Sequence, residues 1–345
     1  MRSRAAILVE QKKPLVLADV EVPEPTFGQV LVEIETSGIC GTQLGEISGK
    51  KGPDRWLPHM LGHEAVGVVK QVGPHVTTVA EGDRVVLHWR QGAGIQAPTA
   101  KYKWGDKTVN AGWITTFQEL TVVSENRVTK ISPEISAEEG VLYGCAIPTA
   151  FGVINNDANV KVGESCVIFG IGGVGQAVVM AAKLAGAHPI IAVDIVDEKL
   201  ELAKRFGATH TINSKSEDAE AKIREILGGT ADVVIENTGV LAVMDLCYRI
   251  AANVTGRTIL VGVPDADQHL TIDSMPLHFG KVLTGSFGGM AKPDYDLPRL
   301  QRMHLAGRFD LSPMVTHRFG LEEINTALDT MRSGEAVRCV LRMRD

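Results

Sequence analysis

The chain is organised around Ser165-Cys166-Val167-Ile168-Phe169-Gly170-Ile171-Gly172-Gly173-Val174-Gly175, where a buried-strand pattern runs into three spaced glycines. A helical pattern follows over residues 176–187. In this order Gly170 allows the tight turn, Gly172 lets backbone approach a pyrophosphate, and Gly175 lets the helix pack closely on the strand. The helix N-terminus also favours phosphate charge. The stretch therefore predicts a dinucleotide site, with contacts from Gly170, Gly172, Gly173, Val174 and Gly175.

The next apolar run indicates which dinucleotide is bound. Residues 189–193 end in Asp194, nineteen residues after Gly175, where an acidic side chain accepts hydrogen bonds from both ribose hydroxyls. A 2′-phosphate would meet this carboxylate, and the neighbouring Ile195 offers no guanidinium. NAD(H) is therefore predicted rather than NADP(H). An ordinary strand-turn-helix unit with a surface Asp194 is the alternative.

Length and composition are those of a globular protein. A chain of 345 residues is long for one core, so two domains are expected. The net charge of −6 offers no basic surface for a phosphate backbone, so no nucleic-acid partner is expected. The apolar run near the start, residues 5–9, is too short for a signal peptide or a membrane span. The expectation is a cytoplasmic protein with no membrane partner.

Two changes of pattern along the chain predict its domains. Residues 1–147 combine short β-like runs with turn signals, which predicts a β-rich, barrel-like domain. Residues 148–287 alternate strand and helix patterns, which predicts a doubly wound parallel sheet and an α/β fold class. Residues 288–345 are expected to return to the first domain. Strands are predicted at 5–9, 29–36, 65–72, 84–87, 121–123, 165–169, 190–194, 209–212, 232–236, 257–262, 282–287 and 337–343.

The five cysteines, an odd number with wide spacing, do not suggest a disulfide scaffold. Those at 166, 247 and 339 lie in apolar patterns and are expected in the core. Cys40 follows a predicted strand, and Cys145 comes just before the dinucleotide domain. Together with His63 they form a donor set suited to catalytic Zn²⁺, with a fourth position open. Spacing alone leaves open that each is an ordinary core or loop residue.

Several motifs in order resemble one family. They are Gly-Ile-Cys-Gly-Thr at 38–42, Gly-His-Glu at 62–64 with Gly67, Gly-Asp-Arg-Val at 82–85, and Gly144-Cys145 with Thr149. With the glycine-rich stretch, they resemble the zinc-dependent alcohol dehydrogenases of the medium-chain dehydrogenase/reductase superfamily over essentially the whole chain. The resemblance implies a GroES-like catalytic domain, a Rossmann domain, and hydride transfer between NAD(H) and an alcohol or carbonyl compound.

The resemblance also implies a role for each matching residue. Cys40, His63 and Cys145 match the zinc ligands, Glu64 matches a carboxylate that can approach the metal, and Thr42 matches the hydroxyl that takes the alcohol proton. Further cofactor contacts are implied for Thr149, Asp194, Lys199, Val261, Val263 and Arg338. Arg338 matches an arginine that pairs with the cofactor pyrophosphate; a solvated arginine is the alternative.

Three departures from the family pattern affect the site. The histidine that often completes the proton relay is replaced by Gly45, and Gln43 replaces an aspartate that supports the zinc histidine in many relatives. Residues 86–125 lack the four cysteines of the structural-zinc lobe, so one zinc per subunit is expected. In that place, residues 88–113 carry three tryptophans and several cations, which predicts either a wall or lid of the substrate site or a self-packed surface loop.

The substrate side is predicted by family alignment. It places Leu57, His59, His88, Trp89, Arg90 and Phe117 at or near the substrate. This mixture of aromatic and polar groups favours a hydroxylated substrate such as a sugar, cyclitol or polyol, because buried polar groups reject ligands that leave them unpaired.

Two other functions remain open from the sequence. One is a zinc-independent quinone or enoyl reductase of the same superfamily, and the other is a non-catalytic NAD-binding sensor. Against both stand the intact Cys40, His63 and Cys145 set and Thr42, while Gly45 and Gln43 weaken that argument. The resemblance further implies a homodimer or homotetramer, joined through the sheet edge near residues 257–263 and 282–287.

Overall fold

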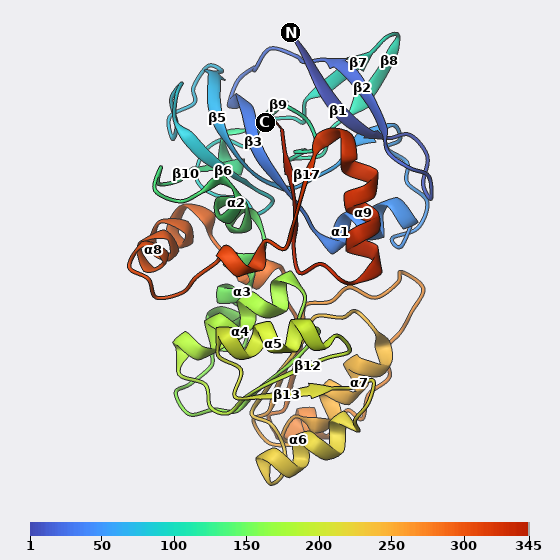
Figure 1. Cartoon of the computed structure of the whole chain (residues 1–345), viewed down its shortest axis with the longest axis vertical. Coiled ribbons are helices and arrows are strands. Elements are labelled where there is room, and N and C mark those ends of the chain that lie inside the picture. Colours follow the sequence, from blue (N-terminus) through green and yellow to red (C-terminus); the bar gives the residue numbers. More distant parts are fainter. Residues whose placement is uncertain (344–345) are drawn as a thin grey trace. The chain divides into compact units, whose positions relative to one another are not determined.

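The structure is a computed structural model that describes residues 1–343. It divides into two compact units: Met1–Cys145 with the chain from Lys292 onward, and Ala146–Ala291. Along the chain, the boundaries between the units fall at 145/146 and 291/292. The sequence predicted these boundaries at 147/148 and 287/288. Figure 1 shows the ribbon coloured along the chain. Among the described residues, no helix is both long and apolar enough to cross a membrane.

The first unit is built on a closed barrel and a seven-stranded sheet. The barrel follows the order β1-β2-β7-β8-β4, and the sheet the order β10-β6-β5-β3-β18-β17 with β9 also pairing with β3. The strands are β1 (Arg2–Leu8), β2 (Val16–Glu21), β3 (Gln29–Ile39), β4 (His59–Met60), β5 (Glu64–Val72), β6 (Arg84–His88), β7 (Lys101–Trp104), β8 (Lys107–Asn110), β9 (Leu120–Ser124), β10 (Val128–Lys130), β17 (His317–Gly320) and β18 (Cys339–Arg342). The predicted return of the chain's last part to this unit is seen in β18, which pairs antiparallel with β3.

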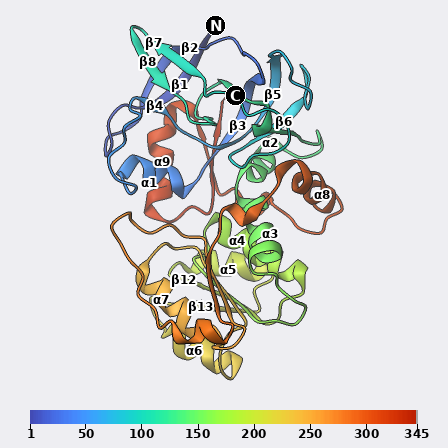
Figure 2. The ribbon, with the colours of Figure 1, turned by 180° about the vertical axis from the view of Figure 1, so that it is seen from behind.

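Helices cover this unit's core. They are α1 (Gly41–Ser48), α2 (Ala137–Gly140), α8 (Pro293–Leu305) and α9 (Ile324–Ser333), with short 3₁₀ turns at Glu125–Arg127, Val141–Gly144, Ser312–Met314 and Leu321–Glu323. α9 lies beside α1 and packs on β17 and β18, as the reverse view shows (Figure 2). Its buried residues Ile324, Ala327 and Leu328 join the apolar interior of the sheet.

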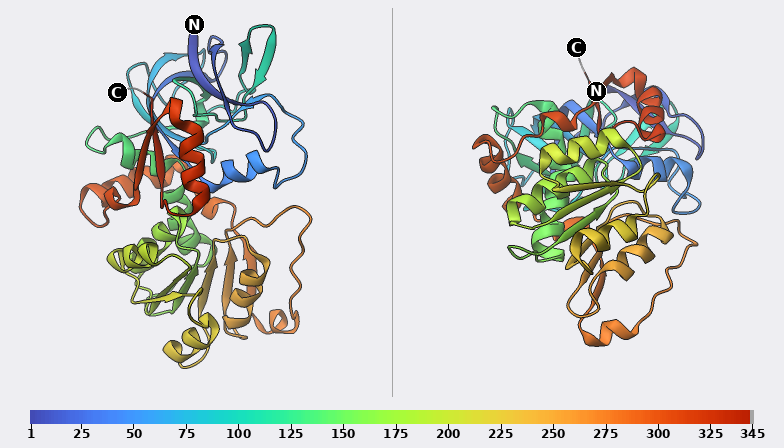
Figure 3. Two further views of the ribbon diagram at one scale, coloured as in Figure 1. Left: turned by 45° about the vertical axis from the view of Figure 1, so that its right-hand side comes forward. Right: turned by 60° about the horizontal axis from the view of Figure 1, so that its bottom comes forward.

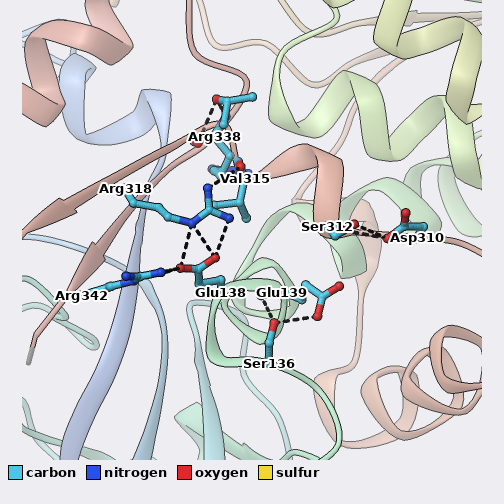
Figure 4. A network of polar contacts seen from close by, with 10 residues as sticks. Ser136, Glu138, Glu139, Asp310, Ser312, Val315, Arg318, Arg338 and Arg342 are labelled. Atoms are coloured by element: carbon cyan, nitrogen blue, oxygen red, sulfur yellow. Dashed lines mark hydrogen bonds and ion pairs between the residues drawn. The ribbon is translucent and has the colours of Figure 1, made fainter. Parts of the chain in front are cut away.

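An acidic residue ties α2 to the last two strands. The Glu138 carboxylate accepts hydrogen bonds from Arg318 on β17, at 2.9 Å, and from Arg342 on β18, at 3.0 Å (Figure 4). Burial alone would raise the pKa of Glu138, but the two guanidinium groups lower it overall. The carboxylate thus holds segments together that lie some 180 residues apart in sequence.

The second unit is the predicted doubly wound sheet. Six strands run parallel in the order β13-β12-β11-β14-β15-β16, with α4 and α5 on one face and α6 and α7 on the other (Figure 3). The elements are α3 (Ala146–Gly152), a π-helical turn (Val153–Asp157), β11 (Cys166–Phe169), α4 (Gly173–Ala185), β12 (Ile190–Asp194), α5 (Asp197–Phe206), β13 (His210–Asn213), α6 (Ala219–Leu227), β14 (Val233–Glu236), α7 (Leu241–Ile250), β15 (Arg257–Leu260), β16 (Val282–Gly285), and 3₁₀ turns at Met275–Phe279 and Gly288–Met290.

Candidate catalytic metal centre

Three separated side chains meet at one edge of the seven-stranded sheet. Cys40 follows β3, His63 precedes β5, and Cys145 follows the turn at residues 141–144. Their ligand atoms, two Sγ and an imidazole nitrogen, all lie within 4.8 Å of one another. β3 and β5 are antiparallel neighbours, with Ser37 opposite Ala65, so the end of β3 and the start of β5 adjoin. Topology alone therefore brings the first two ligands together.

A glycine brings the third ligand in. A Cβ atom at Gly144 would lie 2.5 Å from the Leu87 carbonyl oxygen and 2.6 Å from the Glu64 Cβ. Such contacts are far inside van der Waals distance, so only glycine lets the chain pass this close to β5 and β6. Cys145 follows directly and is delivered to the same edge.

The orientation of His63 leaves one nitrogen for a metal. Its Nδ1 lies 2.6 Å from Nε2 of Gln43, whose Oε1 accepts a hydrogen bond from the Cys40 backbone N–H at 2.9 Å. The imidazole Nε2 is buried and has no hydrogen-bond partner. An orphaned buried nitrogen facing two thiols fits a tetrahedral zinc site with three protein ligands. Gln43 is buried. It stands where many relatives have an aspartate, and it contacts the proposed ligand His63 directly.

The two thiols are electrostatically unequal. The pKa of Cys40 lies well below its usual range because Cys145 donates a hydrogen bond to its sulfur, and His63 adds to the effect. The same contact raises the pKa of Cys145. Burial would lower the pKa of His63, but Cys40 raises it overall. Thiolate and neutral imidazole are the ligand forms, so metal binding here releases protons.

A buried ion pair lies behind the ligands. Glu64 Oε1 accepts a hydrogen bond from Arg338 Nη1 at 2.9 Å, and this nitrogen also donates to the Ile39 carbonyl oxygen at 3.1 Å. Burial raises the pKa of Glu64, although Arg338 opposes this shift. Glu64 Oε2, Arg338 Nε and Arg338 Nη2 are buried without partners. The structure thus places Arg338 beside the predicted metal centre; its pairing with a cofactor pyrophosphate stays a prediction.

Thr42 lies next to the metal-binding residues. It stands in the first turn of α1, is exposed, and has its Oγ1 3.8 Å from Cys40 Sγ. Gly45, one turn further along α1, carries no side chain that could continue a proton path.

The second unit builds the predicted glycine-rich turn. Gly170 has φ +81°, which favours glycine, and a Cβ at Gly175 would lie 2.1 Å from the Gly170 carbonyl oxygen. Gly172 precedes α4 with open space at its Cβ position, while Gly173 and Val174 form the first helical turn. Asp194 ends β12, and its Oδ2 accepts a hydrogen bond from the Ile171 N–H at 2.6 Å. The acidic side chain therefore lies directly against the turn.

The remaining predicted cofactor residues differ in exposure. Thr149 and Lys199 are buried, at 6% and 9% exposed. Val263 is exposed at 60%, and Val261 stands one residue beyond β15. Their contacts with a dinucleotide remain predictions.

The predicted substrate residues are not equally available. His88 and Phe117 have no exposed surface. Both ring nitrogens of His88 are occupied, by the Arg90 carbonyl oxygen at 2.7 Å and by Thr129 Oγ1 at 2.9 Å, and Phe117 belongs to the apolar core. These two side chains lie in the interior of the unit; that Phe117 faces the substrate and His88 lies near it stays a prediction. Leu57, His59, Trp89 and Arg90 retain some exposure.

Two polar residues at or near this region were not singled out from the sequence. Asp54 accepts a hydrogen bond from His59 Nε2 at 2.7 Å. Arg127 is buried beside the 88–113 segment, where its guanidinium donates to the Trp89 carbonyl oxygen. No local pattern marked either residue, because the Asp54 contact depends on the conformation of a loop and the environment of Arg127 depends on strand pairing.

Comparison with known proteins identifies the family. Residues 26–133 match the alcohol dehydrogenase GroES-like domain, and residues 173–303 match the zinc-binding dehydrogenase family. The chain is 34% identical to an alcohol dehydrogenase class-3 of Cereibacter sphaeroides, and 34% identical to an S-(hydroxymethyl)glutathione dehydrogenase of Synechocystis sp.. Each comparison covers 99% of this chain and 100% of the relative.

Solved structures agree with this assignment. An alcohol dehydrogenase zinc-binding domain protein from Burkholderia ambifaria has a TM-score of 0.90 at 32% identity, and a benzyl alcohol dehydrogenase from Acinetobacter calcoaceticus has 0.89 at 29%. Both comparisons cover 100% of each chain. The chain therefore belongs to the zinc-dependent alcohol dehydrogenase family of the medium-chain dehydrogenase/reductase superfamily, as an enzyme that uses zinc and NAD.

Proposed function

We propose that this enzyme interconverts a polar, hydroxylated alcohol and its carbonyl product at a single zinc site formed by Cys40, His63 and Cys145. The observation that carries the proposal is the convergence of these three ligand atoms within 4.8 Å, with the His63 Nε2 buried and unpartnered. When bound, zinc supplies Lewis acidity to the substrate oxygen and the nicotinamide exchanges hydride with the adjacent carbon.

The protein's own residues provide binding and proton transfer. Thr42 is proposed to take the alcohol proton, because its exposed hydroxyl lies beside Cys40. Glu64 stays next to the ligands and is held by Arg338. Asp194 is proposed to bind the adenosine ribose, since its carboxylate adjoins the glycine-rich turn. From the resemblance to the family, we propose further cofactor contacts for five residues: Thr149, Lys199, Val261, Val263 and Arg338.

Metal analysis and cofactor binding test this proposal on one preparation. We expect about one zinc per subunit in protein purified without added metal, together with NADH binding seen by fluorescence titration. Cys40→Ser and His63→Ala are expected to abolish turnover and lower the zinc content while NADH binding persists. Turnover in a zinc-free preparation would refute the mechanism, and a zinc-independent reductase would then be the better explanation.

The substrate class rests on the polar character of the available wall residues. Arg90 lies over the Trp89 ring at 5.6 Å, and His59 is paired with Asp54. Buried or half-buried polar groups of this kind favour ligands that satisfy them. Comparing kcat/KM for polyols, cyclitols and sugars with that for simple n-alcohols tests this point, and a higher value for the n-alcohols contradicts it.

An exposed sheet edge supports a homo-oligomer. β16 is the edge strand of the second unit, and Val282 on it is 40% exposed. Just before it, Met275 and Phe279 are 60% and 64% exposed. An apolar unpaired edge is suited to pairing with a second copy. Light scattering on a Val282→Lys variant should show loss of the oligomer; a wild-type monomer would rule the proposal out.

A cytoplasmic location is also proposed.

A further inference from the structure

Arg127 is a buried cation with no acidic partner. It ends the turn Glu125–Arg127 and is 2% exposed. Nη1 donates to the Trp89 carbonyl oxygen and Nη2 to Gln96 Oε1 at 2.9 Å, while Nε is buried without a hydrogen-bond partner. Across residues 1–343, no carboxylate oxygen lies within 4 Å of this guanidinium. The positive charge is therefore held by neutral groups alone.

None of the groups hydrogen-bonded to Arg127 carries a negative charge. The pKa of Arg127 is lowered to about 10 by burial and then by the positive charge of Arg90. Burial also lowers the pKa of His88 to about 4, so this neighbour is neutral. The adjacent Glu125 carboxylate is already engaged with the backbone N–H groups of Thr77 and Thr78, at 2.6 and 2.7 Å. Burying an ion without a counter-ion is strongly unfavourable, which indicates that a ligand completes the site.

One aromatic side chain covers the guanidinium. The Trp113 ring centroid lies 5.1 Å from the Arg127 guanidinium carbon, and Trp113 is itself 63% exposed. This stacking uses the face of the guanidinium, while Nε on its edge is buried without a hydrogen-bond partner. Movement of one exposed indole is therefore the step that we expect to open the site.

Strand pairing places this cation close to the metal centre. Glu64 on β5 stands opposite His88 on β6, and Leu87 stands opposite Val128 on β10. Arg127 is thus two strands away from Glu64, on the order of 10 Å at about 4.8 Å per strand. Since Glu64 follows the ligand His63, a substrate bound at the metal would have to extend over about this distance for its far end to contact Arg127.

We propose that Arg127, covered by Trp113, binds a carboxylate or phosphate group carried by the alcohol substrate. This inference rests on the proposed function, and it narrows the hydroxylated substrate to one with an anionic group several bonds from the reacting carbon. A guanidinium edge binds such groups through two parallel hydrogen bonds. An anion would also supply Nε with the partner that it lacks.

A matched pair of alcohols tests the assignment. Benzyl alcohol and 4-(hydroxymethyl)benzoate share the reacting group and differ by one carboxylate. We expect the wild-type enzyme to have a higher kcat/KM for 4-(hydroxymethyl)benzoate than for benzyl alcohol, mainly through a lower KM. Arg127→Gln should lower the ratio of these two kcat/KM values by about 10- to 100-fold, as for loss of charge-assisted hydrogen bonds. Arg55→Gln is the control, because Arg55 stacks on Trp56 at 5.0 Å but is exposed; its ratio should match wild type.

Binding without turnover provides a second measurement. Titration with 4-methylbenzoate should change tryptophan fluorescence in wild type, and much less in Trp113→Phe or Arg127→Gln. Equal kcat/KM values for the two alcohols in wild type, or no fluorescence response, would overturn the inference. Inorganic phosphate giving the response when 4-methylbenzoate does not would indicate a free-anion site and would also overturn it. Absence of zinc-dependent turnover for every alcohol tested, with 4-methylbenzoate still bound, would instead contradict only the proposed function.

Discussion

Replacing Gln43 by glutamate should strengthen zinc binding. The Cys40 N–H needs an acceptor, so Gln43 turns Oε1 toward it and its NH₂ group toward His63 Nδ1. An imidazole that ligates metal through Nε2 carries its proton on Nδ1, which then faces another donor. The amide can therefore satisfy the Cys40 N–H or the metal-bound imidazole, but not both. A carboxylate accepts from both.

The expected size follows from the unsatisfied donor. A buried donor without a partner costs about 1–3 kcal/mol, which corresponds to roughly 5- to 150-fold in affinity at 1.4 kcal/mol per tenfold. Gln43→Glu should thus bind zinc about 5- to 150-fold more tightly in competition with a chromophoric chelator. Without metal, the buried carboxylate should lower the melting temperature. Gln268→Glu, which changes the net charge at an exposed position, should leave zinc affinity unchanged. A folded Gln43→Glu protein with unchanged or weaker zinc affinity would refute the reasoning.

Three further predictions concern single contacts. Asp194→Ala should weaken NADH binding by about 10- to 100-fold through lost charge-assisted hydrogen bonds and should not weaken NADPH binding as much; fluorescence titration with both cofactors checks this. Gly144→Ala places a Cβ 2.5 Å from the Leu87 carbonyl oxygen, so we expect a loss of about 1–3 kcal/mol in unfolding free energy and a lower zinc content. Glu138→Gln should lower stability by about 1 kcal/mol or less at neutral pH in urea unfolding. Because the folded-state pKa of Glu138 is lowered, that difference should be full above the unfolded pKa and vanish as pH falls through the folded value.

The second unit was largely predictable because its strands and helices have contrasting periodicities. The strand expected at 190–194 is β12, and the helical pattern expected at 176–187 falls on α4, which spans Gly173–Ala185. Fully buried parallel strands produce continuous apolar runs, and the charged faces of the intervening helices interrupt them. Local sequence therefore sufficed to locate these elements.

The barrel was less predictable because its strands are short and pair with strands that lie far away in the sequence. β2, β7 and β8 were not predicted; residues 101–110 were expected to be part of a lid or a surface loop. The only buried residues of β7 and β8 are Tyr102 and Val109, both without exposed surface, and two apolar residues make a weak alternation. What defines this hairpin is its pairing with β2 and β4, which no local pattern reports.

The same limit applies to the metal centre. The proposed ligands lie in sequence motifs, but the residues that contact those ligands depend on tertiary structure. Arg338 had a predicted role at the pyrophosphate, yet its buried contact with Glu64 joins positions 274 residues apart. Arg127 showed no signal, since an arginine after a strand is ordinarily a solvated side chain.

Charge balance connects the two buried sites. Around the metal centre, Glu64 and Arg338 neutralise each other, the imidazole is neutral as a ligand, and two thiolates leave two negative charges. A divalent cation makes that cluster neutral; without one, the contact between the two thiols lowers the pKa of Cys40 and raises the pKa of Cys145. Around Arg127 the excess charge is positive, because no carboxylate pairs with its guanidinium among residues 1–343 and His88 is neutral. A buried cluster with excess negative charge requires a cation, and by the same reasoning the arginine two strands away requires an anion. A negatively charged substrate would supply the anion that Arg127 requires, and would do so only while it is bound.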